Sequence, residues 1–503
     1  MTFFGANSAP AQVALQYHCA GGAQLAVNTN LAALHKVLAS RSTTNFEILA
    51  LTRFAGLLTN GLRLGPTPPP ASVIEPLLGD VAAAESLGSF AAASIHPPDF
   101  ILALHVDTNR AQFWHDNLAK AFGASGEPLA TQGFNGWRWN TGDSNSFWII
   151  PARDWLLAGR GDDFLPLQAG YLQKVSALGR PAPPLATDWL EADVDSARLG
   201  GWLRLLKPAR IRLTVAAKAD NLRIALRANF AQPMPWTPEP WRIPRDLIRG
   251  RLLTFTAGQN MAAFFNLNPA LSSLAHNPLT NQFYLWALDQ MPLLNYMAWP
   301  VVNASNALLQ LAAQAPAAFN PDLKRFNGTE LVWLPAAGRL FLRNIRLFVP
   351  SLEALQCDDG QFLFVSSFPR QSNGEPAPDS LLAQIQARTN LVYYDWELTG
   401  PRLRQWQILA GMIANRAAGQ IDAAVEAIPL ERSWLSALAP STGNTVTEIT
   451  RVAPDELSLV RNAPLGFTAA ELTLFSDWVC GAFSGPIHPA QPACPPTPFP
   501  AKR

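Results

Sequence analysis

Residues 210–228 read RIRLTVAAKADNLRIALRA. Polar and apolar side chains alternate over 210–216 and again over 222–228, which is the period-two pattern of a half-buried β-strand. The four residues between them, Lys218 to Asn221, are typical of a tight turn. The sequence therefore predicts an antiparallel hairpin here, with its arginines on the solvent face.

Units of a short apolar strand, a polar step and an amphipathic helix recur on both sides of this hairpin. Four copies are visible, at residues 17–38, 189–206, 253–267 and 391–409. We therefore expect an α+β fold of two similar halves, each a mostly antiparallel sheet packed with helices. Internal duplication would explain the recurrence, and the alternative is that any α+β chain contains such pairs. The expected segments are a first half at 11–235, a Pro- and Trp-rich linker at 236–250, a second half at 251–460 and a Pro-rich tail at 461–503.

Composition excludes several classes of protein. The 503 residues carry a net charge of +1, and 15% of them are charged, against about 25% in an ordinary soluble domain. An apolar fraction of 49% with so little net charge excludes intrinsic disorder, and the 32 glycines exclude collagen. Because the chain is not basic overall, nucleic acid is not an expected partner. No nucleotide, metalloprotease or nucleophile-elbow motif occurs, so we expect no cofactor and no metal.

Two segments support a resemblance. QLAVNTN at residues 24–30, just before a predicted helix, and WLEADVD at residues 189–195 are similar to segments of large uncharacterised bacterial proteins, which are usually exported. The resemblance is diffuse and extends over about residues 15–270. It implies an exported α+β protein. Because that family carries no assigned activity, no functional residue can be transferred from it.

The compartment has to be inferred from indirect signals. The first ten residues lack the basic and apolar regions of a secretory signal, and no uninterrupted apolar run is long enough to span a membrane. In contrast, 7 lysines against 31 arginines and 43 prolines favour a periplasmic or extracellular location over a cytoplasmic one. Export would allow a disulfide between Cys480 and Cys494, which flank a Pro-rich segment with no other anchor.

The densest group of possible catalytic or metal-binding side chains lies between residues 96 and 116. Its members are His96, Asp99, His105, Asp107, His115 and Asp116. Imidazole and carboxylate together suit a hydrolase, with His105, Asp107, His115 and Asp116 as the candidates. The alternative is structural, because His96 precedes two prolines and Asp107 is a natural helix-start residue.

A second candidate is a basic block. Residues 201–260 contain 11 basic and 3 acidic residues, a net charge of +8. The candidate ligand-binding residues are Arg212, Arg223, Arg227, Trp236 and Trp241, because guanidinium groups beside aromatic rings can hold an anion. Like charges on one face of a hairpin repel, so we expect an acidic cover. It is either an external anion or the chain's own acidic segment at residues 188–195.

A third feature is a long stretch without charge. Residues 252–288 and 290–321 contain no Asp, Glu, Lys or Arg. Such a stretch fits burial in the fold, a protein or homo-oligomer contact, or a groove for an apolar ligand. The favoured function is therefore a non-catalytic, exported, tryptophan-rich binding or assembly protein. The alternatives are a hydrolase at 96–116 and a carrier of an apolar ligand at 252–321.

Overall fold

The computed structural model describes most of the chain. The described residues are 13–62, 69–91, 99–140, 146–161, 165–178, 188–198, 209–260, 281–290, 295–325, 328–345, 349–368, 374–417 and 430–480. The chain divides into two compact units. Unit 1 comprises Met1–Pro233 with Asp477–Pro495, and unit 2 comprises Met234–Ser476 with Pro496–Arg503.

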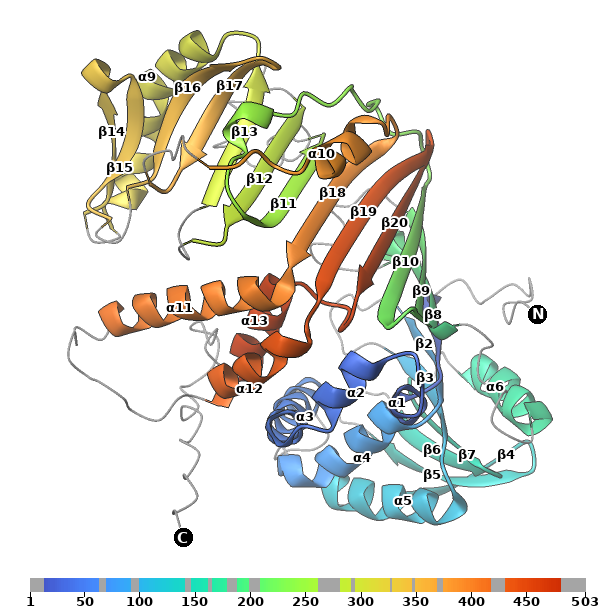
Figure 1. Ribbon diagram of the computed structural model, residues 1–503. Helices are drawn as coiled ribbons and strands as arrows, with labels where there is room; N and C mark the ends of the chain where they lie inside the picture. Colours follow the sequence, from blue (N-terminus) through green and yellow to red (C-terminus); the bar gives the residue numbers. More distant parts are fainter. Residues whose placement is uncertain are drawn as a thin grey trace. The chain divides into compact units, whose positions relative to one another are not determined.

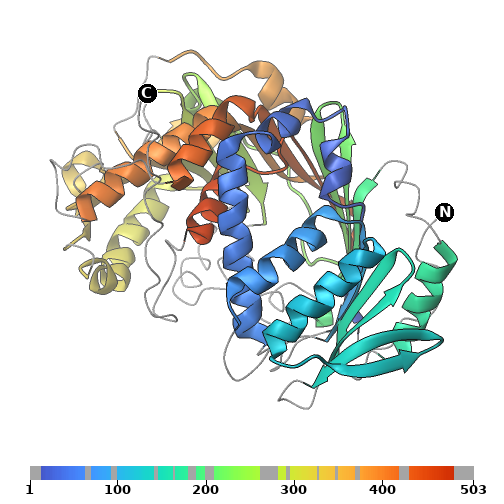
Figure 2. The same ribbon diagram turned by 90° about the horizontal axis from the view of Figure 1, so that it is seen from below.

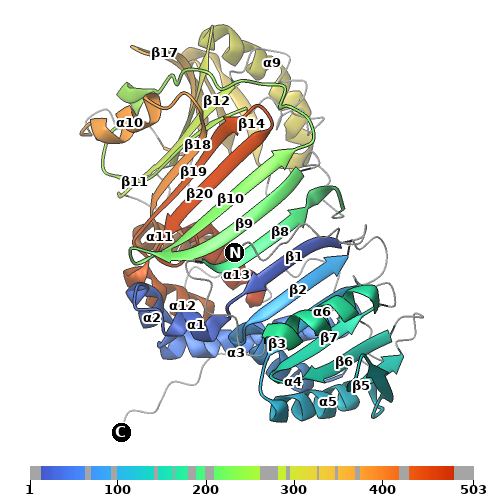
Figure 3. The same ribbon diagram turned by 90° about the vertical axis from the view of Figure 1, so that its right-hand side faces the viewer.

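Unit 1 is built on antiparallel strands. They are β1 (Val13–Cys19), β2 (Ser86–Ala91), β3 (Phe100–His105), β4 (Glu127–Thr131), β5 (Phe134–Asn140), β6 (Ser146–Ala152), β7 (Trp155–Arg160), β8 (Asp188–Asp195), β9 (Ala209–Lys218) and β10 (Asn221–Phe230). They pair in the order β4-β5-β6-β7-β3-β2-β1-β8-β9-β10, which can be followed in Figure 3. The helices are α1 (Gly22–Ala26), α2 (Ala32–Leu38), α3 (Arg41–Leu62), α4 (Ala71–Ala83), α5 (Thr108–Phe122) and α6 (Leu165–Leu178), with a 3-10 turn at Ser196–Arg198.

The hairpin of residues 210–228 is confirmed as β9 and β10. Its register pairs Lys218 with Asn221, so Ala219 and Asp220 form a two-residue turn. Both have positive φ, 49° and 61°, which is the geometry that matches the twist of the two strands. The Asp220 carboxylate also accepts a hydrogen bond of 2.6 Å from the backbone N–H of Ala32, at the start of α2. The turn therefore ties the hairpin to the helix that packs on its apolar face.

The two faces of the unit 1 sheet are covered by different helices. Alternate residues of β3 point to opposite faces. Leu104 packs with Trp114 of α5 and Leu77 of α4, whereas Ala103 packs with Leu172 of α6. Figure 2 shows α4 and α5, in blue, lying along the strands. Both faces of these central strands are therefore closed by helices.

Unit 2 is also antiparallel. Its strands are β11 (Leu252–Gln259), β12 (Gln282–Leu288), β13 (Asn295–Val301), β14 (Glu330–Leu334), β15 (Arg339–Arg343), β16 (Ser351–Cys357), β17 (Gly360–Ser366), β18 (Leu391–Leu398), β19 (Asn444–Ala453) and β20 (Glu456–Ala463). They pair in the order β14-β15-β16-β17-β13-β12-β11-β18-β19-β20 (Figure 1), which is the unit 1 order with each number raised by ten. The helices are α9 (Ala304–Leu323), α10 (Asp379–Gln386), α11 (Thr399–Ala417), α12 (Leu430–Leu438) and α13 (Ala469–Val479), and 3-10 turns lie at Arg245–Leu247, Pro335–Ala337 and Ala439–Ser441.

The predicted fold class needs a correction. The α+β class and the antiparallel pairing are confirmed, but the expected division into two halves, each with a sheet of its own, is wrong. All twenty described strands belong to one sheet. The strand-then-helix pattern predicts local structure only. Where a sheet ends depends on which strands pair with each other, and the pattern does not contain that information.

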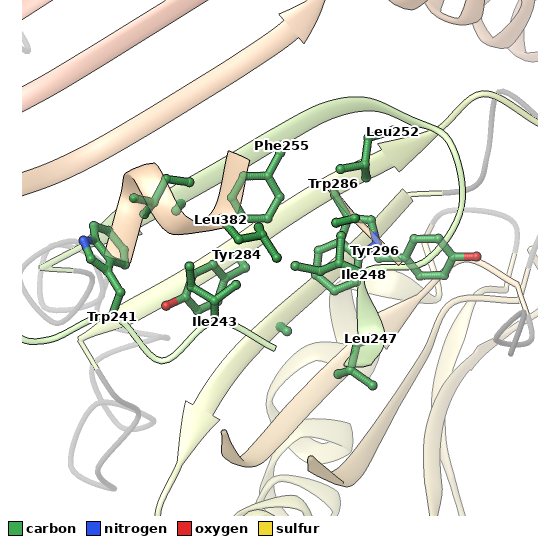
Figure 4. Close-up of a cluster of buried hydrophobic side chains, with 14 of the residues drawn as sticks. Trp241, Ile243, Leu247, Ile248, Leu252, Phe255, Tyr284, Trp286, Tyr296 and Leu382 are labelled. Atoms are coloured by element: carbon green, nitrogen blue, oxygen red, sulfur yellow. The ribbon is translucent and has the colours of Figure 1, made fainter. Parts of the chain in front are cut away.

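The largest core of unit 2 lies on one face of its central strands. Phe255, Tyr284 and Trp286 point into it from β11 and β12, and α10 contributes Leu382 (Figure 4). Trp286 and the Tyr296 ring of β13 stack with their centroids 5.6 Å apart. Aromatic burial of this kind supplies much of the stabilisation of a sheet core. The opposite face of the same strands carries the candidate site.

Candidate functional site

The predicted histidine site is not assembled on one face of the sheet. His105 ends β3 with its ring edge-on to Trp155, at 5.2 Å between centroids, and Trp155 belongs to the core under α6. His115 lies on α5, which covers the other face, and its ring is 4.4 Å from that of Trp137. The sheet therefore separates His105 from His115. His96 lies outside the described residues.

The other members of that group have structural contacts. The Asp107 carboxylate caps α5 by accepting a 2.9 Å hydrogen bond from the Arg110 N–H, as its helix-start position suggests. The His115 Nε2 donates to the carbonyl of Ser125 at 2.8 Å. His115 Nδ1 lies 3.1 Å from Asp116, and this hydrogen bond lowers the pKa of the exposed Asp116 carboxyl. The Asp99 side chain lies against the Cα of Gly161, too close for any side chain there.

The arginine face of the hairpin has an acidic neighbour within the chain. β8 pairs with β9, so that Asp193 lies directly opposite Arg212, and Glu191 Oε2 is 3.8 Å from the Arg212 guanidinium. On the other side of β9, Arg227 of β10 lies directly opposite Arg212, whereas Arg223 is half-buried. The structure thus supplies the internal partner rather than an open anion site. Burial raises the pKa of Asp193, and the nearby arginines oppose that rise.

The two predicted aromatic platforms belong to unit 2. Trp241 is 7% exposed and packs on Tyr284 in the core, with ring centroids 6.1 Å apart. Trp236 is half-buried, and the Arg451 guanidinium lies 5.4 Å from its ring centroid. A buried Trp241 cannot stack on an external ligand. Of the predicted disulfide, Cys494 lies outside the described residues, so the pairing with Cys480 stays a prediction.

In the described residues, the chargeless stretch forms the central strands β11, β12 and β13 and most of α9, while residues 261–280 and 291–294 lie outside the described part of the chain. One face of these strands is the aromatic core described above. On the other face, Leu285 of β12 lies directly opposite Thr256 of β11 and Met297 of β13, and Met297 lies opposite Val365 of β17. All four side chains are half-buried. We call Thr256, Leu285, Met297 and Val365 the apolar row.

A glycine beside this row makes room for an aromatic ring on the sheet. Gly258 of β11 lies directly opposite Phe283, and the Phe283 ring covers the position that a Cβ of Gly258 would occupy. Any larger residue at 258 would push the ring away from the sheet. On its other side Gly258 faces Tyr393 of β18, so two aromatic side chains flank one glycine.

The apolar row ends at a charged cluster. Thr256 lies directly opposite Asp395 of β18 and donates a 2.6 Å hydrogen bond to its carboxylate. Two residues further along the same face, Glu397 is 6% exposed and accepts a 2.8 Å hydrogen bond from the backbone N–H of Ala469, the first residue of α13. One sheet face therefore changes from apolar to acidic within a single row of cross-strand neighbours.

Two arginines accompany these carboxylates. Arg461 of β20 donates to Thr447 at 2.9 Å and to Glu471 of α13 at 2.8 Å. Arg402 of α11 donates to Gln405 at 2.7 Å, and its guanidinium lies 4.8 Å from the centroid of the Trp406 ring. Glu471 also accepts from the N–H of Thr468, at 2.9 Å, while Thr468 accepts from the N–H of Glu471, which is the reciprocal capping box of a helix start.

Burial dominates the electrostatics of this cluster. It raises the pKa of Asp395, and the hydrogen bond from Thr256 opposes it. Burial also raises the pKa of Glu397, opposed by the hydrogen bond from Ala469 and reinforced by the Asp395 charge. The Arg402 pKa is lowered by the same desolvation. The positive charge nearby is therefore too small to restore the ordinary pKa of either carboxyl.

Sequence reasoning missed this cluster, although a signal was present. Residues 391–398 read LVYYDWEL, so Tyr393, Asp395 and Glu397 occupy alternate positions of a strand and share one face. The motif TAAE at Thr468–Glu471 predicts the start of α13. The missing information was the pairing of β18 with β11, which brings the acidic strand to the chargeless one.

Metal and membrane signals are absent from the part of the chain that the structure describes. No three His, Cys, Asp or Glu side chains there form a metal-binding group. None of the described helices is long and apolar enough to cross a membrane.

Comparisons with known proteins do not add a function. No family model and no curated protein matches the chain. Among solved structures, crystal form I of TP0453 aligns with 48% of this chain and 99% of its own, at 9% identity and a TM-score of 0.22. A likeness at that TM-score carries no argument.

Proposed function

We propose that the protein is a non-catalytic binding protein that holds an apolar ligand along the apolar row of unit 2. The observation that carries the proposal is the half-burial of Leu285 and Met297 in the middle of the sheet. Central strands usually bury their apolar side chains on both faces or present polar ones to water. Half-buried apolar side chains at adjacent positions form a surface to which an apolar ligand can bind, because the ligand displaces water from it.

The surroundings of the row limit what it can hold. α9 packs on the neighbouring strands, where Leu308 and Ala315 contact Leu340 and Leu363, and thus bounds the row on one side. From Thr256 on β11 to Val365 on β17 the row crosses three inter-strand spacings of about 4.8 Å, or about 14 Å. That length suits an extended alkyl chain better than a compact ring system.

We also propose that the protein acts outside the cytoplasm. The scarcity of lysine, the abundance of proline and the resemblance to exported bacterial proteins support this location. Fractionation of the native host tests it: the protein is expected in the periplasmic or culture fraction, and recovery only with cytosolic markers would contradict the proposal.

Binding can be tested with a neutral fluorescent probe, N-phenyl-1-naphthylamine. We expect saturable binding to the wild type, displaced by dodecanol. Leu285→Ser should weaken it about tenfold, because a leucine side chain contributes about 1.5–3 kcal/mol when it is fully buried. Leu309→Ser is the matched control, since Leu309 lies on α9 with 55% of its surface exposed.

Two results would reject the proposed function. One is the absence of saturable probe binding by a protein that circular dichroism shows to be folded. The other is an equal affinity of the Leu285→Ser and Leu309→Ser variants for the probe. Mass spectrometry of an organic extract of the purified protein adds an independent readout, and an apolar molecule present in proportion to the protein is expected.

A further inference from the structure

We infer that the ligand is a cationic amphiphile, whose protonated amine or quaternary ammonium head sits at the Asp395 end of the apolar row while its alkyl chain follows the row across the sheet. The inference rests on the proposed function and adds the chemistry of the head group. Three observations carry it: the charge balance of the cluster, the unequal engagement of its carboxylates and the aromatic side chains beside them.

The cluster has a net negative charge. Its charged members are Asp395, Glu397, Glu471, Arg402 and Arg461, with formal charges that sum to −3 + 2 = −1. Arg461 and Glu471 neutralise each other at 2.8 Å. Two carboxylates then face one guanidinium, and a cation would restore the balance. An anionic head placed there would meet both carboxylates at close range and be repelled.

The carboxylates differ in what they already bind. Glu397 is buried, and its carboxylate accepts a hydrogen bond from the backbone N–H of Ala469 at the N-terminus of α13. Asp395 is half-buried, and it accepts a hydrogen bond from Thr256, the first member of the apolar row. A head group attached to a chain in the row therefore reaches Asp395 first. Burial raises the pKa of this carboxyl, so a cation placed beside it would stabilise the charged form.

Aromatic rings stand beside Asp395 on the same face. Tyr393 precedes it by two residues on β18, and both Tyr393 and Phe283 flank Gly258. The π-face of an aromatic ring attracts ammonium groups, most strongly where water is displaced. A carboxylate with adjacent aromatic rings thus favours an ammonium head over an uncharged one.

The test compares three ligands with the same twelve-carbon chain: dodecyltrimethylammonium, dodecanol and dodecanoate. Each displaces N-phenyl-1-naphthylamine from the full-length protein at pH 7, below its micelle concentration. We expect the ammonium compound to bind about tenfold more tightly than dodecanol, the size of one charge-assisted contact. Dodecanoate should bind least tightly.

Two variants locate the preference. Asp395→Asn should reduce the ammonium-to-dodecanol affinity ratio to about one, because it removes the charge while keeping the shape of the side chain. Asp455→Asn, an exposed aspartate in the turn between β19 and β20, is the matched control and should keep the wild-type ratio. The ratio is measured within one protein, so a general loss of stability does not imitate the effect.

The outcomes separate the two proposals. If none of the three ligands displaces the probe, the proposed function itself fails. If all three compete equally, or dodecanoate competes best, the apolar row binds ligand and the cationic head is wrong. A wild-type ratio in Asp395→Asn would also overturn the assignment to Asp395.

Discussion

Glu397 is expected to hold the first turn of α13 on the sheet, and Glu397→Ala tests this. The wild-type carboxylate accepts from the Ala469 N–H at 2.8 Å, and both residues are buried. A hydrogen bond to a charged group contributes about 1.5–3 kcal/mol, and leaving the N–H without an acceptor in a buried position adds a desolvation cost. The burial that raises the Glu397 pKa works against the charged form, so we expect a loss of about 2 kcal/mol.

Hydrogen–deuterium exchange measures this loss locally, which matters because a chain of two compact units does not unfold as a single two-state system. Amides near the start of α13, which begins at Ala469, should exchange about 30-fold faster in Glu397→Ala. Glu397→Gln is the matched control: its amide oxygen remains an acceptor, so rates within about threefold of wild type are expected. Unchanged exchange in Glu397→Ala, or an equally large effect of Glu397→Gln, would refute the hydrogen-bond reasoning.

Two further predictions concern charge and redox state. Burial raises the pKa values of Asp395 and Glu397. Their contribution to stability is therefore fully present below the ordinary pKa values of 3.8 and 4.5, and it is lost as the pH rises through the pKa values of the folded protein. The charges of Arg402 and Arg461 oppose this rise in pKa, and Glu471 and Tyr393 also face the two carboxyl groups. The urea midpoint of the wild type should therefore fall more between pH 4 and pH 7 than that of Asp395→Asn, and parallel curves would contradict this. Thiol titration of the unfolded, unreduced protein isolated from an oxidising compartment should find two of the four cysteines reactive, because Cys480 and Cys494 are bridged; four reactive thiols would reject the bridge.

Local patterns predicted local structure. The alternation over residues 210–228 and its turn residues fix a hairpin without help from the rest of the chain, and the structure has that hairpin in that register. Asp107 as a helix start follows from the same kind of short-range chemistry, since its carboxylate needs only the next turn of backbone. At residues 17–38 the predicted order of a strand and then a helix is found, but at other positions: strand β1 ends at Cys19, and a short helix begins at Gly22.

The predicted histidine site depended on which face of the sheet each side chain occupies, and the sequence alone does not give that. His105 and His115 are ten residues apart in sequence, yet a strand end and a helix on the opposite face separate them. The arginines were correctly placed on one face, and the predicted acidic cover at residues 188–195 is strand β8, which pairs with β9. Proximity in sequence predicts a shared site only when both residues belong to one element or when the pairing is known.

Residues 261–280, which follow β11 as α1 to α4 follow β1, lie outside the described residues. The face that corresponds to the apolar row is closed by helices in unit 1. There, Leu102 and Leu104 of β3 meet Trp114 and Leu118 of α5, and α4 adds Leu77 to the same core. In unit 2, α9 packs on β13 as well as on β14–β17, and Leu285 and Met297 are half-buried. If the apolar row were only a poorly packed part of the core, a larger side chain there should raise the stability of the protein without changing the affinity for the probe. A ligand surface would respond differently, because a larger side chain at Met297 would then compete with the probe, and binding would fall while stability rose.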